Sequence, residues 1–323
     1  MTLLNKLRNK FWNKLQKSLS KIDLDQILYK SFWYSKVNKI DTKNVIPNYF
    51  TATPNIGAGI GHQMANWIAG YWFAEQFGLQ FAHTPFSNEK WEQFLGFGQQ
   101  EVAVQDLVKR GYKIVRIPLF DENNKNEVVR AKKIFKAFNG KKVIFKAEQD
   151  QFYQAQFGVL SALQTKFYAN PIRKTEELKY DATYYNIAIH VRRGDITIGQ
   201  LNGNSNLVMR WLDNDYFINA LQSALSYIKT DKPVKVYLFS QGEKEDFEEF
   251  NKIENLVYCL DMGAQETFLH MVRADALITS KSSFSYKPAL LNKGTKFCPA
   301  NFWHGYPKTK DWILLDDKGF LKN

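Results

Sequence analysis

Apolar and polar segments alternate regularly in the second half of the chain. Short apolar runs there predict five strands, at 186–191, 234–240, 256–260, 276–280 and 296–299. Segments with helical spacing lie between them, at 215–228, 244–251, 265–274 and 283–292. Strands that alternate with helices of this length indicate a doubly wound parallel sheet. Ligands of such sheets bind at the carboxyl ends of the strands.

The first half predicts another α/β layer. A linker and strand at 40–54 lead to a glycine cluster, Gly57-Ala58-Gly59-Ile60-Gly61, and then to a helix at 62–77. A strand at 79–83 follows, and further apolar runs occur at 113–117 and 142–145. A glycine turn, a helix and a strand in this order are typical of the start of an α/β layer.

The length of 323 residues predicts two domains, because a domain has roughly 150 residues. We place the boundary near residue 180, which gives a segment at 1–40 and domains at 41–180 and 181–323. The content of 45% hydrophobic residues is enough to build two cores and excludes a broadly disordered chain.

The net charge of +12 is concentrated at the amino terminus. Residues 1–22 contain six basic residues and no acid, so they carry half of the excess charge. Apolar residues, including Phe11 and Trp12, recur among them at helical spacing. A basic amphipathic helix of this kind either lies on an anionic membrane surface or packs on its own domain. A nucleic-acid-binding protein would spread its charge over the folded domain, so the charge distribution argues against nucleic acid as a partner.

The rest of the composition indicates a cytoplasmic protein, with peripheral attachment to the inner face of the membrane if the helix binds lipid. No secretory signal and no apolar run of about 20 residues is visible in the sequence. Cys259 and Cys298 lie in apolar strands and are expected to be buried free thiols.

Candidate chemistry lies after the first strand of the second half, in His190-Val191-Arg192-Arg193-Gly194-Asp195. Guanidinium groups at the end of a buried strand need an anion, and their planar fork matches phosphate. Asp195 can orient one arginine or accept a proton. The alternative is that both arginines pair with local carboxylates in an ordinary ion-pair network.

A second candidate site is the turn Ser280-Lys281-Ser282-Ser283 after the fourth strand of this half. Hydroxyls and backbone N–H groups at a helix start form an anion site, although Ser282 or Ser283 could simply cap the helix. Both turns belong to the same edge of one parallel sheet. A diphosphate fits between them.

We expect no bound metal. Asp213-Asn214-Asp215 is the only Asp-x-Asp in the second half of the chain, and it opens a predicted helix, where both aspartates serve as cap residues. The glycine cluster does not have the spacing of a dinucleotide-binding loop, and no P-loop motif occurs.

Three ordered stretches resemble motifs of a known superfamily. His190-Val191-Arg192-Arg193-Gly194-Asp195 resembles the H-x-R-R-x-D motif of α1,2-, α1,6- and protein O-fucosyltransferases. Gly59-Ile60-Gly61-His62-Gln63-Met64 is similar to their G-x-G-N-Q segment, and residues 274–285 resemble their third motif. The likeness is closest to bacterial α1,2-fucosyltransferases of glycosyltransferase family 11, through Ser282-Ser283-Phe284-Ser285.

The resemblance implies a GT-B architecture of two facing Rossmann-like domains, with the acceptor at 41–180 and a GDP-sugar at 181–323. It implies an inverting, metal-independent enzyme, without a cofactor, that transfers fucose from GDP-fucose to a glycan hydroxyl. The expected product is an α1,2 linkage on a cell-surface polysaccharide or a lipid-linked oligosaccharide.

The resemblance also assigns roles to single residues. Those matched to donor binding are His190, Arg192, Arg193, Asp275, Ser282, Ser283, Gly59 and Gly61. Arg192 and Arg193 would bind the diphosphate, and Asp275 would contact guanine. By its chemistry alone, His190 could instead be an ordinary strand-end histidine.

The chain departs from the family pattern at two positions. His62 stands where the family has Asn, and Ile196 replaces a tyrosine that often follows the Asp of the arginine motif. Asp195 and His62 are the candidates for the catalytic base. Two other functions remain open: transfer from a different GDP-sugar, and a non-catalytic protein that binds membrane or nucleic acid.

Overall fold

The computed structural model describes residues 46–117, 120–146, 155–203 and 205–322, and four isolated positions nearer the amino terminus. Those four are Leu7, Phe11, Lys14 and Ser18. The amphipathic helix predicted for residues 1–22, and most of the segment 1–40, therefore lie outside the described residues. None of the described helices is long and apolar enough to cross a membrane.

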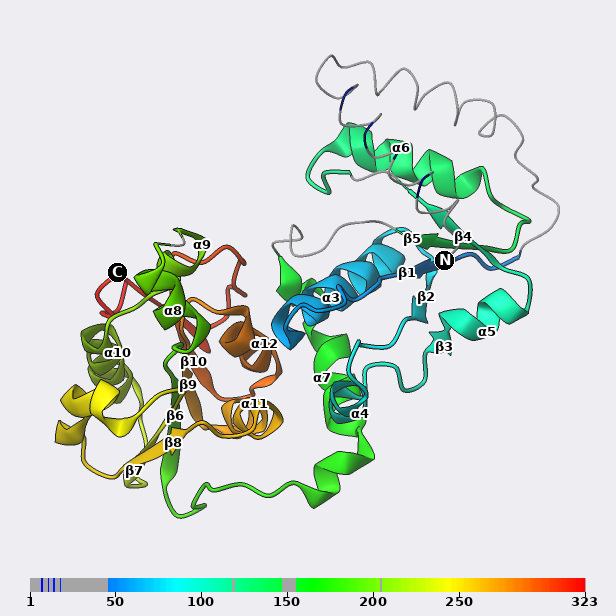
Figure 1. The fold of residues 1–323 in the computed structure, drawn as a ribbon. Coiled ribbons are helices and arrows are strands. Elements are labelled where there is room, and N and C mark those ends of the chain that lie inside the picture. The colour runs from blue at the N-terminus through cyan, green and yellow to red at the C-terminus, as the bar shows by residue number, and fades with distance from the viewer. Residues whose placement is uncertain are drawn as a thin grey trace.

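The first sheet is parallel, with strand order β3-β2-β1-β5-β4 (Figure 1). Its strands are β1 (Tyr49–Thr51), β2 (Gln80–His83), β3 (Val102–Ala103), β4 (Lys113–Arg116) and β5 (Val143–Lys146). The accompanying helices are α3 (Ile60–Gln76), α4 (Glu89–Leu95), α5 (Val104–Lys109), α6 (Lys125–Lys136), η2 (Gln156–Val159), α7 (Leu160–Ala169) and η3 (Pro171–Thr175).

The second sheet is also parallel, with strand order β11-β10-β9-β6-β7-β8. Its strands are β6 (Tyr185–His190), β7 (Val234–Ser240), β8 (Leu256–Leu260), β9 (Ala276–Ile278), β10 (Thr295–Pro299) and β11 (Trp312–Leu315). Its helices are α8 (Asp195–Leu201), α9 (Ser205–Val208), α10 (Asn214–Tyr227), η4 (Lys244–Lys252), α11 (Ala264–Arg273) and α12 (Ser283–Leu291). Helices α11 and α12 cover the face toward the first domain, and α10 covers the other (Figure 1).

The architecture predicted from the sequence is confirmed: two parallel α/β domains face each other. The predicted strand at 234–240 and the predicted helix at 283–292 correspond to β7 and α12. One predicted helix differs, because 244–252 form a 3₁₀ helix. Phe247 and Phe250 are both fully buried, and the segment kinks at Phe247, whose φ of −131° and ψ of 28° are not helical.

Helix α3 is buried over most of its circumference, because it lies between the first sheet and α12 of the second domain. A helix that is apolar all round is expected only in such a position. Its Trp67 is fully buried, and the indole Nε1 donates to His83 Nδ1 over 3.1 Å. The polar edge of the indole is therefore satisfied inside the core.

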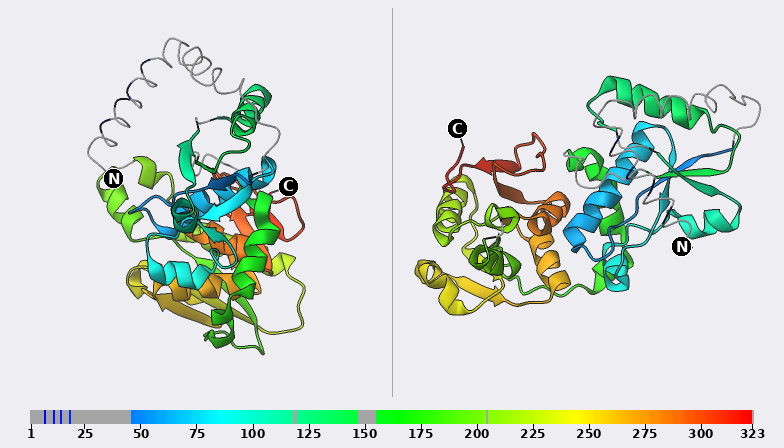
Figure 2. Two further views of the ribbon diagram at one scale, coloured as in Figure 1. Left: turned by 90° about the vertical axis from the view of Figure 1, so that its right-hand side faces the viewer. Right: turned by 45° about the horizontal axis from the view of Figure 1, so that its top comes forward.

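One hydrophobic cluster extends across both domains. Trp91 and Phe94 of the first domain pack edge-on against Phe268 of α11. Helix α7 adds hydrogen bonds to the end of α12: Gln164 Nε2 donates to the Leu290 carbonyl and the Tyr168 hydroxyl to that of Leu291. Helix α12 packs against both α3 and α7 of the first domain, and Figure 2 shows the two domains from two further sides. This interface fixes the residues that face the gap between the sheets.

The domains approach each other closely at Gly61. A Cβ atom at this position would lie 2.9 Å from the backbone of Ser283 in α12, nearer than a real Cβ approaches other atoms. At Gly59, two residues earlier, nothing lies within 4 Å of an added Cβ. Gly61 therefore lets the amino ends of α3 and α12 meet.

Replacing each of these glycines by serine tests that contact. We expect Gly61→Ser to lower the free energy of unfolding by about 1–3 kcal/mol, the usual cost of overpacking. Gly59→Ser should leave it unchanged or slightly higher, because serine is favoured at the helix N-cap that Gly59 occupies. Denaturant unfolding of both variants measures the difference. Equal stability of the two would contradict the contact.

Candidate functional site

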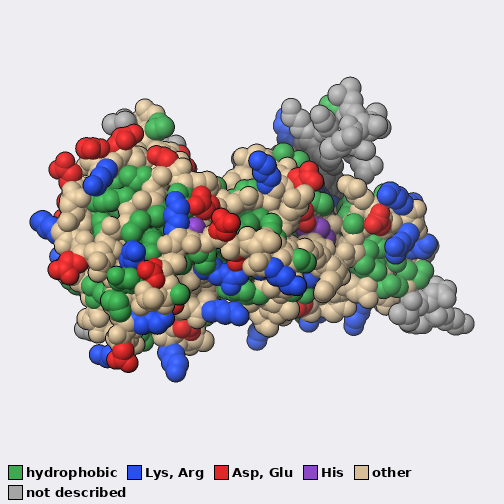
Figure 3. Space-filling model, turned by 90° about the horizontal axis from the view of Figure 1, so that it is seen from below, with side chains coloured by type: hydrophobic (Ala, Val, Ile, Leu, Met, Phe, Trp, Pro, Cys, Tyr) green, Lys and Arg blue, Asp and Glu red, His purple; other side chains and the backbone are tan. Residues whose placement is uncertain are grey.

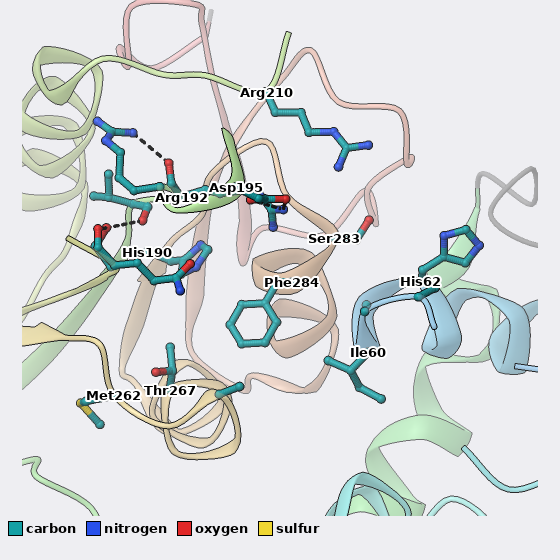
Figure 4. Close-up of a pocket in the computed structure, with 18 residues that line it drawn as sticks. Ile60, His62, His190, Arg192, Asp195, Arg210, Met262, Thr267, Ser283 and Phe284 are labelled. Atoms are coloured by element: carbon teal, nitrogen blue, oxygen red, sulfur yellow. Dashed lines mark hydrogen bonds and ion pairs between the residues drawn. The ribbon is translucent and has the colours of Figure 1, made fainter. Parts of the chain in front are cut away.

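A cavity of about 610 Å³ lies between the domains, in the size range of small-molecule sites. Its wall combines the start of α3 with the turns that follow β6 and β7 and with the starts of α11 and α12 (Figure 4). Among its described lining residues are three arginines, and Asp195 is the single acid. The cavity therefore carries excess positive charge.

His190 ends strand β6 and lies in the cavity wall. Its Nδ1 is 2.9 Å from the Ser280 hydroxyl, and its ring lies 5.6 Å from the ring of Phe284. Burial, and then the neighbouring charge of Arg192, lower the pKa of His190 to about 3. The imidazole is therefore neutral at ordinary pH and does not add to the positive charge.

Arg192 joins the turn after β6 to the start of α12. Its Nη1 donates to the Ser282 hydroxyl over 2.9 Å, and its Nη2 contacts both carboxylate oxygens of Asp195, at 2.8 and 2.9 Å. Ser282 also accepts the backbone N–H of Phe284, so it caps α12 as one sequence interpretation proposed. The cavity thus contains a guanidinium fixed beside a helix N-terminus.

Arg193 does not have the orientation that the sequence analysis expected. Its guanidinium donates to the carbonyls of Arg192 and Leu212 and to the Asn214 side chain, and it stacks on the Trp211 ring. Burial lowers the pKa of Arg193 to about 10, against the opposing effect of acids on the far side of the turn. Arg193 is therefore held by groups of the protein, and its part in binding a diphosphate stays a prediction.

The reason for the different orientations is local geometry. Successive side chains of an extended segment point to opposite sides, so the guanidinium groups of Arg192 and Arg193 reach different partners. Gly194 then turns the chain with a φ of 71°, and a Cβ there would clash with the Gln241 side chain. The turn is thereby held against β7.

Arg210, which the sequence analysis missed, also faces the cavity (Figure 4). Its guanidinium lies over the ring of Trp303 at 5.0 Å. The buried Nε has no hydrogen-bond partner among the described residues. Burial, and then the charge of Arg192, lower the pKa of Arg210. No motif surrounds Arg210, and only the folded chain brings it beside Arg192.

The first domain contributes Gly59, Gly61 and His62 to the wall, opposite Ser283. His62 is the only titratable side chain that this domain places among the described lining residues. Figure 4 shows it across the gap from Arg210 and Ser283. The predicted position of His62 at the cleft is confirmed, while its chemical role stays a prediction.

Asp275 is not in the cavity. It precedes β9, whereas the lining residues follow strands, so it lies at the opposite edge of the sheet. Its Oδ2 accepts the backbone N–H of Asn186 over 2.8 Å. Asp275 is therefore not placed to contact a guanine bound in this cavity. The end of the cavity away from Arg210 is lined by Met262, Thr267 and Phe284 (Figure 4).

The Asp213-Asn214-Asp215 stretch opens helix α10, as predicted. Asp213 occupies the N-cap, but its carboxylate accepts the Trp211 indole N–H instead of capping the helix. Within the part of the chain that the structure describes, no group of three or more metal-ligating side chains occurs. Cys259 and Cys298 are buried and free, as expected.

Comparison with known proteins gives fold likenesses at low identity. No protein-family model and no curated protein sequence matches the chain. The fucosyltransferase NodZ from Bradyrhizobium is 13% identical, with a TM-score of 0.44, 77% of this chain covered and 94% of that chain. An apo-form POFUT1 structure is 11% identical, with a TM-score of 0.44 and coverage of 77% and 96%.

A third similar structure is a mutant of Arabidopsis thaliana FUT1 in complex with GDP. It is 12% identical and has a TM-score of 0.40, with 93% of this chain covered and 79% of that chain. All three TM-scores are below 0.5.

The buried histidines predict how stability depends on pH. Burial lowers the pKa of His190 to about 3 and that of His304 to about 2, with Lys287 and His62 adding to the effect on His304. The unfolded chain takes up these protons below about pH 6.5 and the folded chain does not. Stability is therefore complete above that pH and is lost as the pH falls.

Because only the unfolded chain protonates each histidine, the free energy of unfolding should fall by about 2 kcal/mol per histidine when the pH is lowered from 7 to 5. We expect His190→Gln and His304→Gln each to reduce that difference by this amount. Denaturant unfolding at the two pH values measures it. A variant whose difference equals that of the wild type would show that its histidine is protonated in the folded protein.

Proposed function

We propose that the protein is an inverting, metal-independent glycosyltransferase that transfers fucose from GDP-fucose to a hydroxyl of a glycan. The observation that carries this proposal is the contact between Arg192 and Ser282. It joins two stretches that resemble fucosyltransferase motifs, and it does so inside a cavity between two α/β domains. A diphosphate fits beside this guanidinium and the amino end of α12.

The donor site extends from the diphosphate to the nucleoside. The side chains of Met262 and Phe284 offer apolar and aromatic surfaces on which a base can stack, and Thr267 offers a hydroxyl. His190 lies between this end and Arg192, with a neutral imidazole. A different GDP-sugar remains the second candidate donor.

The acceptor enters from the side of the first domain. His62 faces the cavity there, whereas Asp195 is paired with Arg192, so we assign the role of general base to His62. The base removes the proton of the acceptor hydroxyl as its oxygen forms a bond to C1 of fucose. The bond from C1 to the β-phosphate oxygen breaks, and GDP leaves with an added negative charge that Arg192 stabilises.

We also propose that the acceptor is a cell-surface polysaccharide or a lipid-linked oligosaccharide and that the linkage is α1,2. Residues 1–22 would hold the enzyme at the inner face of an anionic membrane, through their six basic residues. The surface of the folded part is mixed: Figure 3 shows Lys and Arg interspersed with Asp and Glu over the visible face of both domains. That distribution is not typical of a nucleic-acid-binding protein.

Arg192→Ala tests the proposal directly. We expect kcat/KM for fucosyl transfer to fall by a factor of about 100 or more, the scale of losing one preorganised charge donor. The matched control is Lys229→Ala, which removes one positive charge at an exposed position remote from the cavity lining. Steady-state rates with GDP-fucose measure both variants. Near-normal turnover of Arg192→Ala would remove the phosphate role.

A further inference from the structure

The cavity wall contains an arginine with no assigned role. Arg210 follows the short helix α9 and reaches the cavity from a different segment than Arg192 does. Figure 4 shows its guanidinium above Ser283, pointing toward the gap that separates Ser283 from His62. Arg210 and Arg192 therefore approach the start of α12 from two directions.

The protein does not neutralise this pair of arginines. Asp195 is the single acid among the described lining residues, and both of its oxygens already contact Arg192. Arg210 Nε is buried without a hydrogen-bond partner in the described part of the chain. An arginine that has lost water in this way needs an anion to offset the cost.

Arg193 differs in each of these respects. Its guanidinium donates to two backbone carbonyls and to Asn214, and Asp213, Asp246 and Glu249 lie near its charge. The N–H groups of Arg193 therefore find hydrogen-bond acceptors within the protein, and its charge needs no ligand. Of the three arginines in the described cavity wall, Arg192 and Arg210 are the ones that leave positive charge for an anion.

The stacking of Arg210 on Trp303 supports a role in binding. A guanidinium over an indole keeps its N–H edge directed outward while its face is covered. The side chain is thereby held in one orientation before a ligand arrives. A fork held in this way can donate two hydrogen bonds to one phosphate.

We propose that Arg210, in place of Arg193, is the second arginine of the diphosphate site. This inference rests on the proposed function for the identity of the nucleotide, but not for the presence of an anion site. Arg192 and Arg210 would hold the diphosphate between them at the start of α12. Both would gain interaction energy as the leaving group acquires charge, which makes Arg210 a further catalytic residue.

Calorimetric binding of GDP, guanosine and inorganic pyrophosphate to the full chain tests this inference. We expect Arg210→Ala to weaken GDP and pyrophosphate by about 10- to 100-fold, the range for hydrogen bonds to a charged group. Guanosine affinity should not change, since guanosine carries no phosphate. Lys229→Ala, which removes one positive charge elsewhere, should bind all three as the wild type does.

Arg210→Lys separates a binding role from a packing role. Lysine keeps the charge but not the planar fork, so GDP should bind less tightly than to the wild type and more tightly than to Arg210→Ala. If Arg210→Ala has a lower melting temperature, the lysine variant carries the comparison. Unchanged affinity for GDP and pyrophosphate in a folded variant overturns the inference.

The same titrations distinguish this inference from the proposed function. Wild-type protein that binds pyrophosphate through Arg210 but prefers UDP or ADP to GDP would support the anion site and contradict the GDP-sugar proposal. Wild-type protein that binds neither GDP nor pyrophosphate would overturn both.

Discussion

Positive charge collects where the strands of the second sheet end, and the described cavity wall contains one carboxylate to balance it. Arg192 and Arg210 lie on this wall together with Asp195, and the neutral His190 lies beside them. Placing two guanidinium groups near each other in a partly buried site costs free energy unless an anion binds. The position of Ser282, which both caps α12 and accepts from Arg192, fixes one of these groups at the helix N-terminus.

The first domain forms one wall of the cavity that contains this anion site. Gly61 lets α3 approach α12 closely, and the shared core around Phe268 keeps the two sheets in one relative position. His62 follows Gly61 directly, so the contact that joins the domains also sets the place of the candidate base. Stability and the proposed chemistry therefore depend on the same few residues between α3 and α12.

Much of the fold could be predicted from the sequence, because buried parallel strands and amphipathic helices have distinct periods. Strand β7 matches its predicted range, and α12 differs from its prediction by one residue. The 3₁₀ helix η4 was predicted as an ordinary helix, since the local pattern does not show how Phe247 and Phe250 would be buried. The edge strand β11 was not predicted.

The site could be predicted only in part. His190, Arg192, Ser283 and His62 line the cavity as expected, because their motifs follow strands or begin helices. Two features of the site could have been foreseen: Asp275 precedes its strand, and the side chains of neighbouring residues such as Arg192 and Arg193 point in different directions. Arg210 could not have been found, since it lies in no motif and depends on how the chain returns after α9.

Donor-dependent release of nucleoside diphosphate is the measurement that tests the central claim most directly. Purified protein would be offered a panel of GDP- and UDP-sugars in the presence of EDTA. The account predicts release of GDP from GDP-fucose at a rate that the chelator does not change. Release from UDP-sugars alone, a large loss of rate in EDTA, or failure to release or bind GDP at all would contradict it.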